Sequence, residues 1–422
     1  MSTAKRITPW GDRNFRWLMA GGMLSMTGDQ FTLIALPWLV LRLTGDPLAL
    51  GVVIALMGIP RAVFILIGGA VVDRHSPQRV MMWSKHASAV LLGLLAALTL
   101  AGHATLPVVY ALALAIGLAQ AFGIPSGTAM LPRSVPPALL QSANAAMMGM
   151  RQLSMLAGPL LAALLLAFAG DDAGKAGGVA DMRALGLAFA VDCATFVLSA
   201  FTLAQVRPAP GAPRADEPGV LRSVGAGLAM VWRDVALRTC FLYWGLVAFL
   251  VGGTMQVALP LLADGVLHGP ASLGILMGAH GAGTLLGMAL SPLAARLALP
   301  FGALLLIGDG LAGLLLAPLG GIGAMWQATV LLVGLGCIGG LLQVAIFTWI
   351  GRRVAPQMLG RAMSIFLFIF MGLAPLSAAA TGALLQHVSL ATLYFASGAL
   401  LVCCAVNAWL FTPMRKIAAA PA

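Results

Sequence analysis

The sequence predicts an all-α polytopic membrane protein of twelve transmembrane helices, arranged as two pseudo-symmetric six-helix bundles. Three observations carry this prediction: the composition, the spacing of the apolar runs and an internal repeat. Of the 422 residues, 60% are hydrophobic and only 9% are charged, whereas a soluble domain carries about 25% charged residues. A water-soluble fold has no means of hiding that much apolar surface, so the chain is expected to lie in a bilayer.

Each apolar run is long enough to cross the bilayer, which takes about 20 residues at the rise of an α-helix. A helix satisfies its own backbone groups in lipid, so every run is interpreted as a helix. The twelve runs cover residues 17–42, 48–72, 80–101, 106–128, 140–168, 184–204, 237–262, 272–295, 301–319, 325–350, 362–385 and 390–412.

The basic residues predict the orientation. The stretch before the first run is polar and basic, and that run lacks a small-residue cleavage site, which favours a retained helix and a cytoplasmic N-terminus. With this orientation 19 of the 24 Lys and Arg residues fall on the inner side, Lys85 among them, as the positive-inside rule requires. This asymmetry accounts for the net charge of +11 without nucleic acid as a partner. The expected location is a bacterial-type inner membrane with both termini in the cytoplasm.

A Pro-rich polar stretch, RPAPGAPRADE at 207–217, separates the two sets of six runs and is followed by an amphipathic segment at 221–238. Motifs recur across it: Ala35-Leu36-Pro37 returns 223 positions later, and Arg133 with the residues after it returns 219 positions later. The predicted organisation is an N-terminal segment (1–16), a first bundle (17–204), a linker (205–236), a second bundle (237–412) and a tail (413–422).

After the second run the chain reads Gly69-Ala-Val-Val-Asp73-Arg74-His-Ser-Pro-Gln-Arg79. This resembles the loop signature of the major facilitator superfamily, with Ser-Pro-Gln in place of its second Gly and following basic residues. The variant is similar to the branch that contains macrolide and siderophore exporters. The resemblance implies a secondary transporter, with proton-coupled efflux of a hydrophobic or amphipathic small molecule as the first expectation. An importer or uniporter of a small metabolite, or a lipid transporter, is the alternative.

In that family the loop implies a cytoplasmic latch. A carboxylate at Asp73 can accept a helix N-terminal amide or an Arg from the other half, so we expect it to reach Gly360 and Arg361 when the inner gate is shut. A purely topogenic role of the charges is the alternative. The fifth run contains Ser154-x-x-x-Gly158-Pro159, a relaxed form of an element associated with exporters. The proline predicts a kink there, although plain helix packing explains the segment about as well.

Ionisable residues inside apolar runs are costly in lipid and are therefore candidates for function. On the first run Ser25, Gly28, Asp29 and Thr32 share one helical face. The resemblance places that helix beside the central cavity, so Asp29 is the preferred proton- or cation-coupling carboxylate. A structural ion pair with Arg61 is the alternative.

Further candidates for the cavity are polar or aromatic residues in other runs. Arg151 is expected either to meet an anionic substrate or to balance Asp29, whereas Asp192 and Asp309 are interpreted as structural because their helices support the cavity in the family. The full set of cavity candidates is Ser25, Thr32, Arg61, Asn144, Arg151, Gln256, His280, Gln343 and Phe347.

Other classes of function find little support in the sequence. The motifs HExxH and GxSxG, which would indicate an enzyme, and the phosphate-binding GxxxxGK[ST] of ATP-driven pumps are absent. The five Cys residues show no metal-ligand spacing, so no cofactor or metal is expected. The expected partners are a small molecule, protons and the bilayer. Because one chain with two halves can form the whole pathway, a monomer is the simplest expectation.

Overall fold

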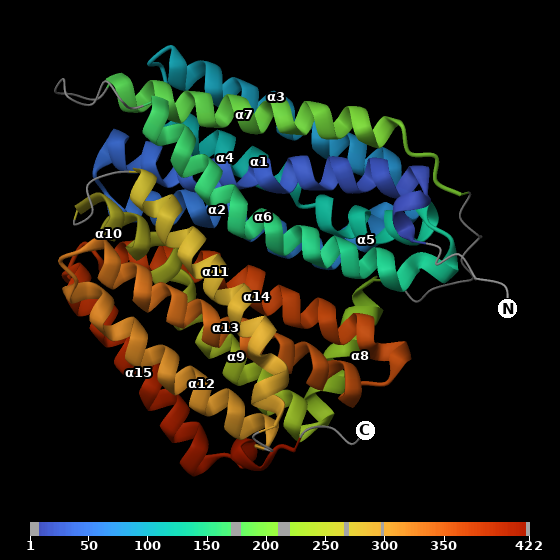
Figure 1. Ribbon diagram of the computed structural model, residues 1–422, viewed down its shortest axis with the longest axis vertical. Helices are drawn as coiled ribbons and strands as arrows, with labels where there is room; N and C mark the ends of the chain where they lie inside the picture. The colour runs from blue at the N-terminus through green and yellow to red at the C-terminus, as the bar shows by residue number, and fades with distance from the viewer. Residues whose placement is uncertain (1–7, 170–178, 210–219, 266–269, 297–298, 419–422) are drawn as a thin grey trace, which may run out of the picture.

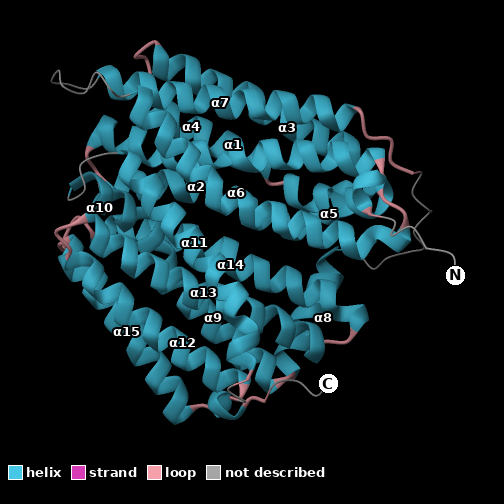
Figure 2. Cartoon of the chain, viewed as in Figure 1, coloured by secondary structure: helices cyan, strands magenta, loops and turns pink. Residues whose placement is uncertain are grey.

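The structure is a computed structural model that describes residues 8–169, 179–209, 220–265, 270–296 and 299–418. Within these ranges the chain consists of helices joined by short loops, without a strand (Figure 2). Twelve stretches are long and apolar enough to cross a membrane. The twelve-helix all-α fold expected from the sequence is confirmed.

Four of the first six spans begin before the run that predicts them, and four end after it. They are formed by α1 (Arg13–Thr44), α2 (Pro47–Arg74), α3 (Pro77–Leu100), the pair α4 (Leu106–Gln120) and α5 (Gly123–Ser134), α6 (Leu140–Ala169) and α7 (Val179–Ala204).

The second six spans follow a short helix, α8 (Val220–Arg233), and the polar linker. They are formed by α9 (Val235–Gly253) with α10 (Leu259–Gly265), α11 (Pro270–Ala295), α12 (Phe301–Leu316), α13 (Met325–Arg353), α14 (Pro356–Leu384) and α15 (Leu390–Phe411). The amphipathic segment is shorter than expected: it ends at Arg233, because Asp234 caps the next helix by accepting hydrogen bonds from the Ala236 and Leu237 amides.

Two spans are interrupted. The run expected as one helix at 106–128 is broken between Gln120 and Gly123, because Pro125 has no N–H to donate back to the Ala121 carbonyl. The span of α9 and α10 contains a π-helical turn, Thr254–Ala258, just before Pro260. Breaks of this kind leave backbone groups available at membrane depth, where transport folds place their binding sites.

The two bundles share a core at one end only. The start of α1, the end of α15 and α8 lie at one end of the molecule, called here the terminal end, and α10 lies at the opposite end (Figure 1). At the opposite end a single hydrophobic core joins both halves and includes Trp38, Leu259 and Tyr394. At the terminal end each half has a core of its own, one around Phe15 and one around Trp244. The bundles are therefore joined at the opposite end and separate toward the terminal end.

Close helix contacts hold the opposite end shut. The α2 and α14 backbones meet at Gly51, where an added Cβ would lie 2.5 Å from the Ala378 carbonyl oxygen. The α6 and α11 backbones meet in the same way at Gly274, where a Cβ would lie 2.5 Å from the Pro159 carbonyl oxygen. Small residues allow such approach between membrane helices. A hydrogen bond from Gln386 to Asp46, 3.2 Å long, joins the two halves at the same end.

Candidate functional site

A partly buried polar network occupies the middle of the first bundle. Asp29 lies near the midpoint of α1, and its Oδ1 accepts a hydrogen bond of 3.0 Å from Nε2 of Gln120. The side-chain amide oxygen of Gln120, Oε1, in turn accepts a hydrogen bond from the Arg61 guanidinium of α2. An amide therefore stands between the carboxylate and the cation, in place of the direct ion pair that the sequence left open. Gln120 was not among the predicted residues, although it is the one amide side chain in its apolar run and lies at the break in that span.

Lys85 corrects the count of inner charges. The sequence places it among the inner charges, but the structure buries it in α3 at 5% exposure, where its ammonium donates hydrogen bonds to the hydroxyls of Ser25 and Ser199. The Phe196 ring lies 5.7 Å from the ammonium. Lys85 is nine positions into α3, and a charge so far inside a span is the signal that could have identified it.

Ser25 and Thr32 lie inside the first bundle and not on the cavity, which corrects their expected position. Thr32 donates to the carboxylate of Asp192, which is fully buried in α7 and also accepts from Thr195. An added Cβ at Gly28 would overlap Thr195, so this face of α1 packs tightly on α7. Of the expected polar face, Ser25, Gly28 and Thr32 are turned toward α3 and α7, whereas Asp29 reaches Gln120 of α4.

A second polar group lies on α6, where Asn144 and Arg151 are both exposed together with Met148 and Met155. These residues are spaced i, i+4, i+7 and i+11 and share one helical face. Asn144 donates to the Leu140 carbonyl at 3.1 Å. No hydrogen bond or ion pair joins Arg151 to any residue that the structure describes.

The candidates of the second bundle do not converge on one point. Gln256 is half-buried in the π-helical turn, and the Nδ1 atom of the His280 ring is buried without a hydrogen-bond partner among the described residues. Gln343 is half-buried on α13, and Phe347 packs edge-on against Phe366 at 5.5 Å. Asp309 is buried in α12 at 7% exposure, beside Tyr243 of α9. The first bundle thus holds the connected polar groups.

The gating loop is only partly described. The side chains of Gly69, Asp73 and Arg74 lie outside those that the structure describes, so the expected contact of Asp73 remains a prediction. Arg79 and Gly360 are exposed, and Arg361 donates to the Met358 sulfur at 3.1 Å.

Helix α8 packs beside Arg361, the expected partner of the gating loop, since an added Cβ at Gly227 would lie 3.2 Å from Cβ of Arg361. The predicted kink element lies in α6, which stays helical through Pro159. There Gly158 packs against the Gln30 side chain, and the Pro159 carbonyl faces Gly274 of α11. Both residues therefore contribute to close helix packing.

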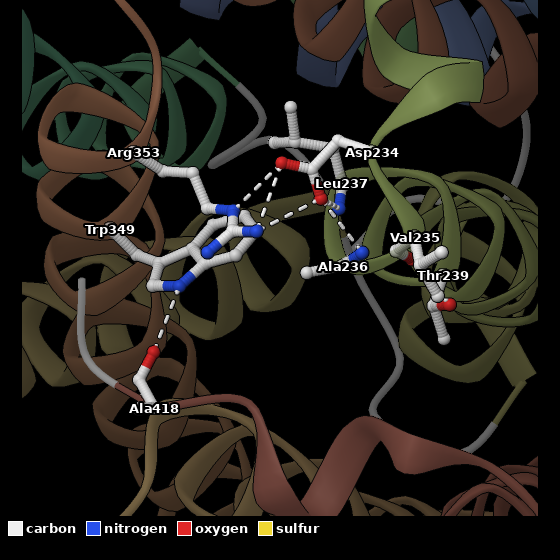
Figure 3. A network of polar contacts seen from close by, with 8 residues as sticks. All are labelled: Asp234, Val235, Ala236, Leu237, Thr239, Trp349, Arg353 and Ala418. Atoms are coloured by element: carbon white, nitrogen blue, oxygen red, sulfur yellow. Dashed lines mark hydrogen bonds and ion pairs between the residues drawn. The ribbon is translucent and has the colours of Figure 1, made fainter.

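A third network, not anticipated from the sequence, closes the terminal end of the second bundle (Figure 3). Asp234 forms an ion pair of 3.0 Å with Arg353 at the end of α13. The Arg353 guanidinium lies 5.9 Å from the centre of the Trp349 ring, whose indole N–H donates to the Ala418 carbonyl at 3.2 Å. Partial burial raises the pKa of Asp234, but hydrogen bonds from Arg353 and from the Leu237 amide outweigh it and hold that pKa below its ordinary value.

Comparison with known proteins agrees with this architecture. An uncharacterized MFS-type transporter, y4rN of Sinorhizobium fredii, is 26% identical over 391 residues, which are 91% of each chain. The multidrug efflux pump Tap of Mycolicibacterium fortuitum is 29% identical over 229 residues, about half of each chain at 53%.

Solved transporters share the fold at much lower identity. The nucleoside transporter NupG superposes with a TM-score of 0.73 at 14% identity, covering 93% of this chain and 98% of its own. A D-xylose–proton symporter superposes with a TM-score of 0.71 at 14% identity, covering 96% of this chain and 98% of its own. The family model of the Major Facilitator Superfamily matches residues 18–378. The chain therefore belongs to the major facilitator superfamily, a family of transporters and not of enzymes.

Proposed function

We propose that this transporter exports a hydrophobic or amphipathic small molecule in exchange for protons, and that Asp29 is the carboxylate that couples the two movements. The observation that carries the proposal is the position of Asp29: at mid-membrane, partly exposed, and linked to a cation only through the Gln120 amide. The match to the multidrug efflux pump Tap supports export as the direction.

The chemistry of the network suits reversible protonation. A carboxylate in a direct buried ion pair loses that partner when it is protonated, at a cost of several kcal/mol. Here protonation of Asp29 leaves the bond between Arg61 and Gln120 in place. The carboxyl can therefore change its charge while the guanidinium keeps its hydrogen bond to the amide. Lys85, held by two hydroxyls, contributes a second fixed positive charge to the same bundle.

In this proposal the terminal end faces the cytoplasm of a bacterial cell, and the molecule spans its inner membrane as a monomer. The excess of Lys and Arg at that end supports the orientation. The structure is then open toward the cytoplasm and closed toward the outside by the contacts of α2 with α14 and of α6 with α11. Cargo would enter from the cytoplasm, and the contact expected between Asp73 and the start of α14 would close that side.

The test is substrate-driven proton movement in proteoliposomes, with the neutral dye N-phenyl-1-naphthylamine as the first cargo. Asp29→Asn is expected to abolish proton movement, whereas Asp309→Asn, which neutralises a buried carboxylate of the other bundle, is expected to preserve it. Proton movement that persists in Asp29→Asn would remove the coupling role from that residue. Dye movement only toward the side that the terminal end faces would favour the importer instead.

A further inference from the structure

The exposed face of α6 points into the space between the bundles and not into lipid. Farther along the same face, Ala162 and Leu166 are buried at 0% and 2% exposure, so the face lies inside the molecule at the closed end. The reverse face of α6 stays exposed along its whole length, through Leu153, Leu160 and Leu164. Because the reverse face is the one that meets lipid, Arg151 and its neighbours line the opening toward the terminal end.

The contacts of α6 with its neighbours show which sides of the helix are covered. On one side Thr27 of α1 donates to Ser154 at 3.2 Å, and on the other side Gln152 donates to the Met288 sulfur of α11 at 2.9 Å. The face that carries Arg151 lies between these two contacts. Arg151 is about 17 Å along the helix from its first residue, which is deep within the membrane span.

The guanidinium of Arg151 has no counter-charge in the part of the chain that the structure describes. The two carboxylates inside the first bundle are already engaged: Asp29 accepts from Gln120, and Asp192 accepts from Thr32 and Thr195. A positive charge at this depth is tolerated while water fills the opening. When the bundles close around cargo that water is excluded, and an unpaired cation becomes costly.

The surroundings of Arg151 are apolar and deformable. Met148 and Met155 on its own helix are 62% and 49% exposed. Unbranched thioether side chains adapt to cargo of irregular shape. A single cation amid such side chains matches a molecule with one anionic group and a bulky apolar body.

We infer that Arg151 is an anion subsite and that the cargo class is amphipathic anions, with a carboxylate, sulfonate or phosphate that pairs with the guanidinium during closure. This inference rests on the proposed export function and specifies its substrate. An anion would supply the acceptors that the fork of the guanidinium lacks, by charge-assisted hydrogen bonds. A lipophilic cation of the same size would instead be repelled.

The test uses two dyes that share one apolar body. 8-Anilinonaphthalene-1-sulfonate carries one negative charge, and N-phenyl-1-naphthylamine is its neutral counterpart. Both are titrated by fluorescence against the full chain in phosphatidylcholine nanodiscs, with empty nanodiscs subtracted. The measured quantity is the ratio of the two affinities, in which general effects on the cavity cancel.

Arg151→Gln is expected to lower the anion-to-neutral affinity ratio about tenfold, the range for losing a hydrogen bond to a charged group. Arg415→Gln, which removes an exposed charge at the terminal end, is expected to leave the ratio unchanged. Arg151→Lys keeps the charge and is expected to restore most of the ratio. It also provides a test of the charge if the Gln variant folds poorly.

An equal ratio in wild type and Arg151→Gln would overturn the anion subsite, as would tighter binding of a cationic dye than of the sulfonate. If the wild type moves the neutral dye under either of these outcomes, the export proposal stands and only the substrate class fails. If it moves neither dye in proteoliposomes, the export proposal itself fails.

Discussion

A single methyl group at Gly51 should open the end of the molecule that the structure shows closed. In Gly51→Ala the new Cβ would lie 2.5 Å from the Ala378 carbonyl oxygen and 3.1 Å from Cα of Ala379. Ordinary contacts between non-bonded heavy atoms lie at about 3.5–4.0 Å, so α14 would have to move away by about 1 Å.

Overpacking of this kind costs about 1–3 kcal/mol. The cost applies only while α2 and α14 touch at this end, so it shifts the balance toward the state open on that side by roughly 5- to 150-fold. Gly149→Ala is the matched control, because an added Cβ there meets nothing within 4 Å.

Thr105 and His387 are both exposed near the opposite end and lie in different halves. The distance between spin labels at these two positions, measured by pulsed electron paramagnetic resonance, would report the change. The five native Cys residues would first be replaced by Ser. We expect a longer distance population to grow in Gly51→Ala and not in Gly149→Ala. A distance distribution that stays unchanged in a folded Gly51→Ala variant would show that this contact does not hold the end closed.

Two further variants test packing and charge elsewhere. Gly336→Ala should lower the free energy of unfolding by about 1–3 kcal/mol, because its methyl would overlap the His280 carbonyl. Gly339→Ala is the control and should not lower it, because the space around Gly339 is open. Equal thermal midpoints of the two variants would contradict the packing argument. Asp234→Asn should lower the midpoint at pH 7 by the equivalent of at most about 1 kcal/mol. The pKa of Asp234 in the folded protein lies below the ordinary 3.8, so the stabilisation by its charge is present above that pH and is lost as the pH falls further. The thermal midpoints of wild type and Asp234→Asn should therefore converge in acid. A difference that stays constant with pH would contradict the role of the charge.

The architecture could be predicted from composition because the bilayer leaves few choices. A run of about 20 apolar residues in lipid has to be a helix, so the spans followed from hydropathy alone. The break after Gln120 escaped that reasoning, since hydropathy is insensitive to a missing backbone hydrogen bond. Gly123 and Pro125 were the local signal, and they carry the information that a window average removes.

The candidate site was harder to predict because rotation of a helix about its axis is set by packing. The spacing of Ser25, Gly28 and Thr32 correctly placed them on one face, but that face packs on α7 because Gly28 admits Thr195. Lys85 resembles an orienting charge because it is only the sixth residue of the run expected at 80–101, whereas the helix begins at Pro77 and so places it deeper in the span. Only the hydroxyls of Ser25 and Ser199, from two other helices, show why it can be buried.

The π-helical turn between α9 and α10 shows how the two halves have diverged. Arg13 and Val235, the first residues of α1 and α9, are 222 positions apart, whereas Pro37 and Pro260 are 223 apart. The turn at Thr254–Ala258 lies between these landmarks and absorbs the additional residue without breaking the span.

By this register the counterpart of Asp29 is Val251, and the second half carries no equivalent of its carboxylate. That half is built instead around stacked and edge-on rings, such as Phe301 against Trp349 with centres 4.7 Å apart. At the terminal end the second half thus has a cluster of rings, whereas the first half has the connected polar groups. If Asp29 couples transport as proposed, a change in its protonation would act directly on the first bundle, and the second would respond only through the contacts that join the two halves.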